Sequence, residues 1–243
     1  MKKLVFFLIL FISFSDLFSQ EEENREEKNK KIINVDFPGH IKLNLGLNIF
    51  LDSDEAMQIG VFSSRSFGLN YIKPLFLTDN FSFSPGLGLE FENYSFKNNV
   101  IVNYKYDVDD NQVNFIDTLS IDSKKNKLVN STLELPLSFR YHFGNSDEKN
   151  NRLFVGIGFD FGVRLNSFTK LKHIKNNKSI VNKSKNDFGL SNYRYSLSFI
   201  FGNDNFNFFI KYFLSDFFQS ENNPEYIIVK PIVIKTGFSF SLF

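Results

Sequence analysis

"RLFVGIGFDFGVRL", residues 152–165, decides the fold of this protein. Apolar side chains occupy every second position from Leu153 to Leu165, and Gly, Asp160 and Arg164 stand between them. A period of two is typical of a β-strand with one apolar and one polar face. The same alternation recurs seven more times, at about 41–51, 65–77, 81–96, 132–143, 190–201, 206–214 and 227–242. The chain is therefore predicted to be all-β.

The connections between these runs alternate in length. Short connections rich in turn-forming residues lie at 78–80, 144–151 and 202–205, and longer ones lie near 52–64, 97–131, 166–189 and 215–226. Membrane barrels have short turns on one side of the membrane and longer loops on the other, and their strands need about 9 to 11 residues. We therefore predict an eight-stranded antiparallel up-and-down transmembrane β-barrel over residues 39–243.

Prolines inside the predicted strands conflict with a closed sheet. Pro74, Pro85, Pro136 and Pro231 each lack the N–H group that a ladder hydrogen bond needs. We expect bulges or positions at the barrel rim to accommodate them.

The pattern alone fits two kinds of barrel. In a membrane barrel the apolar face contacts lipid, whereas in a soluble lipocalin-like barrel it lines a ligand cavity. The chain has 33 Phe and nine Tyr, and the face they dominate is too large for a small cavity. The opposite face carries Gly, Ser and charges of both signs, which suits a narrow lumen. We favour the membrane barrel, with a soluble periplasmic binder as the alternative.

The two ends of the chain indicate export. "MKKLVFFLILFISFSDLFSQ", residues 1–20, has a basic head and a short apolar run, as a secretory signal peptide does. Residues 21–38 are highly charged and are predicted to be a flexible periplasmic lead-in. A terminal Phe is typical of barrels that are recognised by the barrel-insertion machinery, but Phe243 lies one position out of phase with Phe238, Phe240 and Leu242, which weakens this signal. The predicted location is the outer membrane, reached with a cleaved signal peptide.

Two stretches resemble a known family. "STLELPLSFRYHF", residues 131–143, and "SRSFGLNYIKPLFLTDNFSFSPGLGLEFENYSF", residues 64–96, are similar to strands of the PorT-type and related porin-like outer-membrane β-barrels of Gram-negative bacteria. The resemblance spans most of residues 41–243. It implies the barrel fold and the outer-membrane location, and it implies no particular activity.

The polar face of the predicted strands carries charges of both signs. In an eight-stranded barrel the interior is only just filled by side chains, so these groups are predicted to pair as a plug. A conducting lumen is the alternative. The predicted lumen charge network is Lys42, Glu90, Glu92, Glu134, Arg140, Asp160, Arg164, Arg194, Lys211 and Lys235.

Signals for other chemistry are weak. His40 and His142 fall at the predicted turn side and His173 falls in a Lys-rich loop, so none has an evident catalytic partner. The acidic stretch at 107–117 lacks the spacing of a calcium loop. The formal net charge of +1 argues against a nucleic-acid partner. We expect no enzyme activity, no cofactor and no metal site.

Loops carry function on rigid scaffolds. The connection at 97–131 contains β-prone pieces and is predicted to extend the barrel as a hairpin. The connection at 166–189 is rich in lysine, and two interpretations of it stay open. It is a hydrated loop without a ligand, as charged runs usually are, or an anion-binding loop that faces lipopolysaccharide through Lys170, Lys172, Lys175 and Lys178. A barrel that binds surface partners or assists assembly or secretion is the favoured function. A small porin-like transport protein is second, and an outer-membrane enzyme is third.

Overall fold

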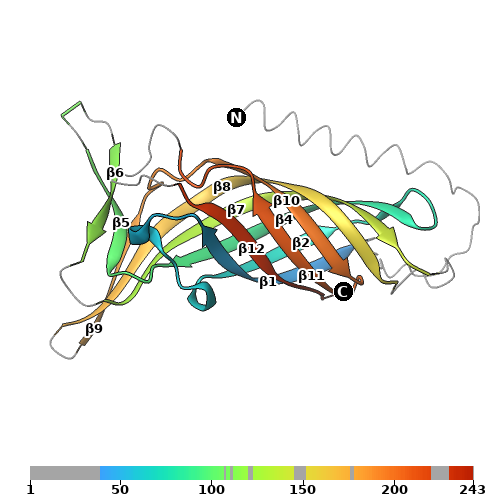
Figure 1. Ribbon diagram of the computed structural model, residues 1–243, viewed down its shortest axis with the longest axis horizontal. Helices are drawn as coiled ribbons and strands as arrows, with labels where there is room; N and C mark the ends of the chain where they lie inside the picture. Colours follow the sequence, from blue (N-terminus) through green and yellow to red (C-terminus); the bar gives the residue numbers. More distant parts are fainter. Residues whose placement is uncertain are drawn as a thin grey trace, which may run out of the picture. The chain divides into compact units, whose positions relative to one another are not determined.

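The computed structural model describes residues 39–106, 108–109, 112–119, 123–144, 152–175, 178–219 and 230–242 (Figure 1). The predicted signal peptide and charged lead-in lie outside these residues. No helix within the described ranges is long and apolar enough to cross a membrane. The elements are β1 (His40–Leu51), η1 (Glu55–Met57), η2 (Val61–Ser63), β2 (Arg65–Ile72), β3 (Leu75–Phe76), β4 (Phe81–Ser95), β5 (Val100–Tyr106), β6 (Gln112–Thr118), β7 (Ser123–His142), β8 (Phe154–Lys175), β9 (Lys178–Lys185), β10 (Tyr193–Gly202), β11 (Phe206–Phe213) and β12 (Ile232–Ser241).

Eight strands form a closed antiparallel ring. Each of β1, β2, β4, β7, β8, β10, β11 and β12 pairs with the next in this order, and β12 pairs with β1 to close the ring. The closing seam runs from the Lys42–Ser241 pair to the Leu51–Ile232 pair. Closure leaves the ring without a free edge strand, as a lipid environment requires. The predicted eight-stranded up-and-down barrel is confirmed.

The two longest strands extend well beyond their predicted bounds. β7 begins at Ser123, nine residues before the predicted start at 132, and β8 continues ten residues past the predicted end at 165. β8 then turns into β9, which pairs with it from Phe168–Lys185 to Lys175–Lys178. The predicted loop at 166–189 is therefore wrong over most of its length, because this segment is a β-hairpin.

A β-bulge explains why the sequence pattern hid this extension. The β7–β8 register shifts between the Ser131–Asn166 and Thr132–Arg164 pairs, so Leu165 is an extra residue on β8. One inserted residue reverses the faces of all residues beyond it. Odd-numbered residues of β8 face outwards before the bulge, and even-numbered ones face outwards after it.

Two of the four prolines, Pro85 and Pro136, lie close together where β4 pairs with β7. Pro85 of β4 is paired with Leu137 of β7, and the next pair in the ladder is Gly88 with Glu134. The ladder is thus interrupted over the residues between these pairs, which include Pro136. Because the register is the same on both sides of the gap, the two strands absorb both prolines without a bulge. Pro74 and Pro231 lie just outside strands.

The apolar side chains face outwards. Leu87, Leu89 and Phe91 of β4 are exposed, while Glu90 and Glu92 between them are almost completely buried. The same arrangement holds on the other barrel strands, so the charged face lines the interior. A soluble barrel with an apolar cavity would have the opposite arrangement, and that alternative is wrong for this chain.

Candidate functional site

A network of ion pairs fills the middle of the lumen. Lys235 lies at its centre, with its Nζ atom 3.0 Å from Glu90, 2.7 Å from Glu92 and 4.0 Å from Glu134. Lys211 contacts Glu134 at 2.8 Å and Asp160 at 3.3 Å. The guanidinium group of Arg194 pairs with Glu92. These seven residues, all predicted from the alternation, are brought together by six different strands.

The ion pairs cross the lumen instead of following neighbouring strands. Lys235 is on β12 and its partners Glu90 and Glu92 are on β4, three strands away around the ring. The distances of 2.7 Å to 3.0 Å leave no aqueous gap between the opposite walls at this level. Tyr94 and Asn130 also donate hydrogen bonds to Glu92. At this level of the lumen the described side chains form one connected network of ion pairs and hydrogen bonds.

A second, smaller cluster lies nearer the short turns. Arg140 contacts the carboxylate of Asp204 at 3.3 Å, and the Lys42 Nζ atom lies 3.9 Å from the same oxygen. Both cations also face the Phe154 ring, at 4.6 Å and 6.0 Å from its centroid. The alternating pattern did not reveal Asp204, because this residue belongs to the short turn at 202–205 and to no alternating run.

Arg164 does not join either cluster, contrary to the prediction. Its guanidinium group donates to the Asp187 backbone carbonyl at 3.0 Å, to Ser167 at 3.2 Å and to Asn192. The bulge at Leu165 explains the difference, since Arg164 stands where β8 leaves the regular barrel. Its contacts fix the loop before β10 instead of neutralising a lumen carboxylate.

One buried pair resembles the nucleophile and base of a hydrolase. The Ser82 Oγ atom lies 2.8 Å from the His142 Nε2 atom, a contact that the sequence did not indicate. Both residues are fully buried, and the imidazole lies beside the rings of Phe76 and Phe154. The other ring nitrogen, Nδ1, has no hydrogen-bond partner within the described chain, so no carboxylate orients it.

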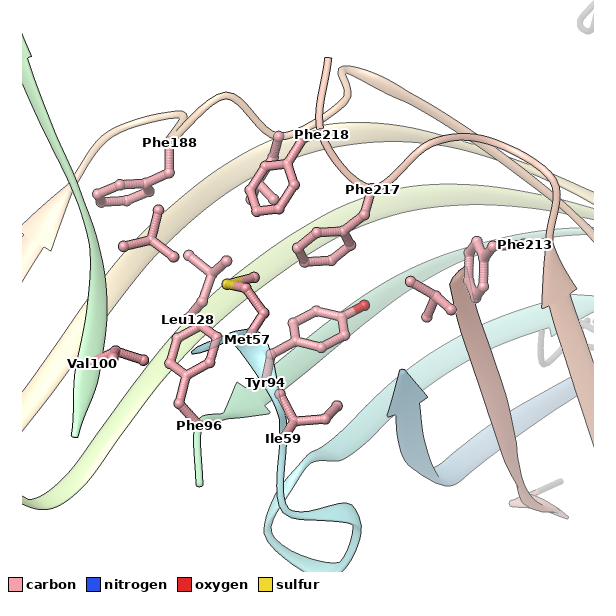
Figure 2. Packing of buried hydrophobic residues seen from close by; sticks show 13 residues of the cluster. Met57, Ile59, Tyr94, Phe96, Val100, Leu128, Phe188, Phe213, Phe217 and Phe218 are labelled. Carbon is pink, nitrogen blue, oxygen red and sulfur yellow. The ribbon is translucent and has the colours of Figure 1, made fainter. Parts of the chain in front are cut away.

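An apolar cluster covers the lumen at the end with the long connections. Figure 2 shows aromatic and aliphatic side chains that converge from strand ends and from loops. Tyr94 and Phe217 pack with ring centroids 4.8 Å apart, and Phe217 contacts Phe218 at 4.9 Å. Members such as Met57 come from irregular segments without a period of two, which is why the sequence pattern did not reveal them. The cluster comprises Met57, Ile59, Tyr94, Phe96, Val100, Val102, Leu128, Phe188, Leu190, Phe213, Phe217, Phe218 and Val233.

Strands continue past the barrel at the same end. β5 and β6 form a hairpin, which confirms the prediction for the connection at 97–131, and β9 lies beside the extended β8 (Figure 1). Lys170 and Lys172 belong to β8 and Lys178 begins β9, so they are strand residues and not loop residues. Lys175 ends β8, and its side chain lies outside what the structure describes. His173, predicted to be in a loop, is buried in β8.

In the described ranges, no group of three or more His, Asp or Glu side chains could hold a metal ion. The lumen carboxylates of Glu90, Glu92 and Glu134 form ion pairs with lysine or arginine side chains.

Comparisons with known proteins identify the family to which this chain belongs. Residues 18–217 match the family described as outer membrane protein beta-barrel domain. No curated protein sequence matches the chain. Two crystal structures of Ail, the attachment invasion locus protein of Yersinia pestis, one of them in complex with the heparin analogue sucrose octasulfate, match at 12% and 11% identity. Each match covers 83% of this chain and 97% of that chain, with a TM-score of 0.29.

Proposed function

This chain belongs to the outer membrane protein β-barrel domain family and lies in the cell outer membrane, and from that premise we propose that it is a closed scaffold for an extracellular binding surface. The scaffold is the plugged barrel, and the surface is the extension formed by β5, β6, the outer parts of β7 and β8, and β9. Such a barrel serves binding, assembly or secretion and not passage of solutes.

The main support for a closed lumen is the contact of Lys235 with Glu90 and Glu92 across it. A conducting pore of this size would need a continuous column of water between opposite walls. Here buried cations and carboxylates meet at 3.0 Å or less, and an apolar cluster covers the same lumen at one end. Breaking a buried pair leaves an uncompensated charge, which is costly, so opening would require rearranging the whole network.

Membrane topology supports the extension as the working surface. Barrels of this class have short turns on the periplasmic side and long connections outside the cell. The turn between β10 and β11 spans only a few residues, whereas β5, β6 and β9 all belong to the long connections at the opposite end. The extension therefore faces the cell exterior, where it is held in place by strands that continue from the rigid barrel.

Conductance tests this proposal directly. Full-length protein reconstituted in a planar bilayer should show no defined ion steps, because the lumen is filled. The matched variants are Glu134→Gln, which alters the network, and Lys105→Gln, which alters an exposed lysine of β5. Stable steps in the wild-type protein would overturn the proposal in favour of a transport protein, and a change in those steps with Glu134→Gln but not with Lys105→Gln would place the conducting path in the lumen.

A further inference from the structure

The extension carries a continuous face of lysine side chains. Lys127 of β7 is paired directly with Lys170 of β8, and Lys170 is paired directly with Lys183 of β9. In the adjoining rows Lys125 is paired with Lys172, and Lys185 is paired with Phe168. Directly opposed residues on neighbouring strands stand about 5 Å apart. We call these six residues, Lys125, Lys127, Lys170, Lys172, Lys183 and Lys185, the lysine face.

The lysine face is on the same side of the sheet as the lipid-facing belt. On β7 the odd-numbered residues from Tyr141 to Lys127 are exposed or half-buried, except Val129, which is buried in the same outward row. The side chains at alternate positions, such as Asn126, Leu128 and Asn130, are buried on the inner side. On β8 the bulge at Leu165 brings Lys170 and Lys172 to the outer side in phase with β7. The face is thus directed towards the surrounding membrane surface and not into the lumen.

No carboxylate neutralises this face within the described residues. None of the six lysines forms an ion pair there, and the Lys127 ammonium group donates to the neutral side chain of Asn93. Burial lowers the pKa of Lys127 below its usual value, and the positive charges of Lys170, Lys125 and Lys183 lower it further. Like charges that are directly opposite destabilise a sheet, so this arrangement costs folding free energy.

Protection of a sheet edge does not account for the pattern. Lysine on an edge strand prevents pairing with other chains, and β9 is such an edge. However, Lys127 is paired with Ser95 of β4 on one side and with Lys170 on the other, and Lys170 itself has partners on both sides. Lys127 and Lys170 therefore lie on interior strands, where there is no edge to protect. A ligand that supplies negative charge would explain why lysines stand directly opposite one another there.

We infer that the lysine face binds the phosphate groups of lipopolysaccharide in the outer leaflet. The inference rests on the proposed function, because it names the partner of the same extension. Phe91, which is paired with Ser131, marks the outer edge of the apolar belt near β7. Lys127 lies four residues further along the strand, which is about 13 Å. That distance places the ammonium groups in the polar layer above the hydrocarbon, where the phosphates lie.

The contacts of Phe168 support this placement. Phe168 is paired with Val129 on one side and with Lys185 on the other, so an aromatic ring lies between the apolar belt and the lysines. The Lys183 Nζ atom lies 5.6 Å from the centroid of the same ring. Aromatic and basic side chains in this order are typical of a membrane interface.

The test measures binding of lipopolysaccharide to the folded full-length protein in detergent. Fluorescence anisotropy would compare intact lipopolysaccharide with the same material after removal of its phosphates, at about 0.05 M and about 0.5 M salt. The variant Lys127→Gln, Lys170→Gln, Lys183→Gln removes the central row. The matched control, Lys73→Gln, Lys97→Gln, Lys105→Gln, removes three exposed lysines outside the face.

We expect the central-row variant to bind intact lipopolysaccharide about tenfold or more weakly at low salt, with a smaller dependence on salt. The control variant should bind as the wild-type protein does, and wild-type binding should fall when the phosphates are removed. Replacing the same row by arginine should preserve binding if the charge is what matters. Equal binding by the Gln variant, or equal binding of dephosphorylated material, would overturn the inference.

The two proposals fail in different ways. Ion steps in the bilayer would remove the plugged-barrel function and leave lipopolysaccharide binding by the outer face intact. Loss of phosphate preference would remove the lysine face as a binding site and leave the closed lumen unaffected.

Discussion

Lys235 is the residue on which the lumen network depends. It contacts three carboxylates, and it is the only cation within 4.0 Å of the Glu90 carboxylate among the described residues. Glu92 has a second partner in Arg194, whose guanidinium group also stacks over the Phe213 ring at 3.9 Å. Removing one member of a buried pair costs more than the pair contributes, because the other charge stays buried.

We therefore predict that Lys235→Met lowers the free energy of unfolding by about 3–5 kcal/mol. The measurement is urea-induced unfolding of the protein in detergent micelles. The matched control is Lys230→Met, since Lys230 forms an exposed pair with Asp216 at 2.9 Å, and it should change the free energy by no more than about 1 kcal/mol.

A second variant separates the charge from the packing. Combining Lys235→Met with Glu90→Gln removes the carboxylate that would be left alone, so part of the lost stability should return. If the double variant is no more stable than Lys235→Met, the effect of Lys235 is packing and not ion pairing.

At the scale of the element, the bulge on β8 determines which side chains lie on the outer face of the extension. Leu165 is the extra residue, and beyond it Thr169 is buried on the inner side while Lys170 lies on the outer side. Without the bulge, Lys170 and Lys172 would point to the inner side of the sheet. The outward position of these lysines therefore depends on one residue, Leu165, that interrupts the alternation.

The chain has no cysteine, so single introduced cysteines can report on these faces. In intact cells, a membrane-impermeant maleimide should label Lys170→Cys and leave Thr169→Cys unlabelled. Deleting Leu165 should reverse this pattern, because a one-residue slip exchanges the faces. Equal labelling of both cysteines in the undeleted chain would show that the extension is not a continuation of the barrel strands.

At the scale of the whole molecule, closure between β1 and β12 removes every free edge of the barrel. The seam includes the direct pair of Gly46 and Gly237, where neither residue has a side chain to separate the strands. A methyl group at Gly237 would lie 2.6 Å from the Gly46 Cα atom, so the close approach requires glycine. A closed ladder has no terminal strand from which detergent can begin to unzip it.

We predict that the protein in outer-membrane fractions resists SDS until it is heated. Unboiled samples should run at a different mobility from boiled samples on the same gel, because the ring remains folded. A single mobility under both conditions, or recovery of the protein in the soluble periplasm, would contradict the closed membrane barrel.

The alternating pattern of residues predicts the eight strands, the alternation of short and long connections, and the residues of the central lumen network. These features are local, because a period of two and a turn are written in adjacent residues such as those of 152–165. Only the tertiary structure decided that the charged face is inside and that Lys235 meets Glu90, 145 positions away in the chain. It also decided that Asp204 joins Arg140, that apolar loop residues cover the lumen, and that lysines from three strands share one face. Each of these contacts depends on strand register, and a register can shift by one residue, as it does at Leu165, without a visible change in composition.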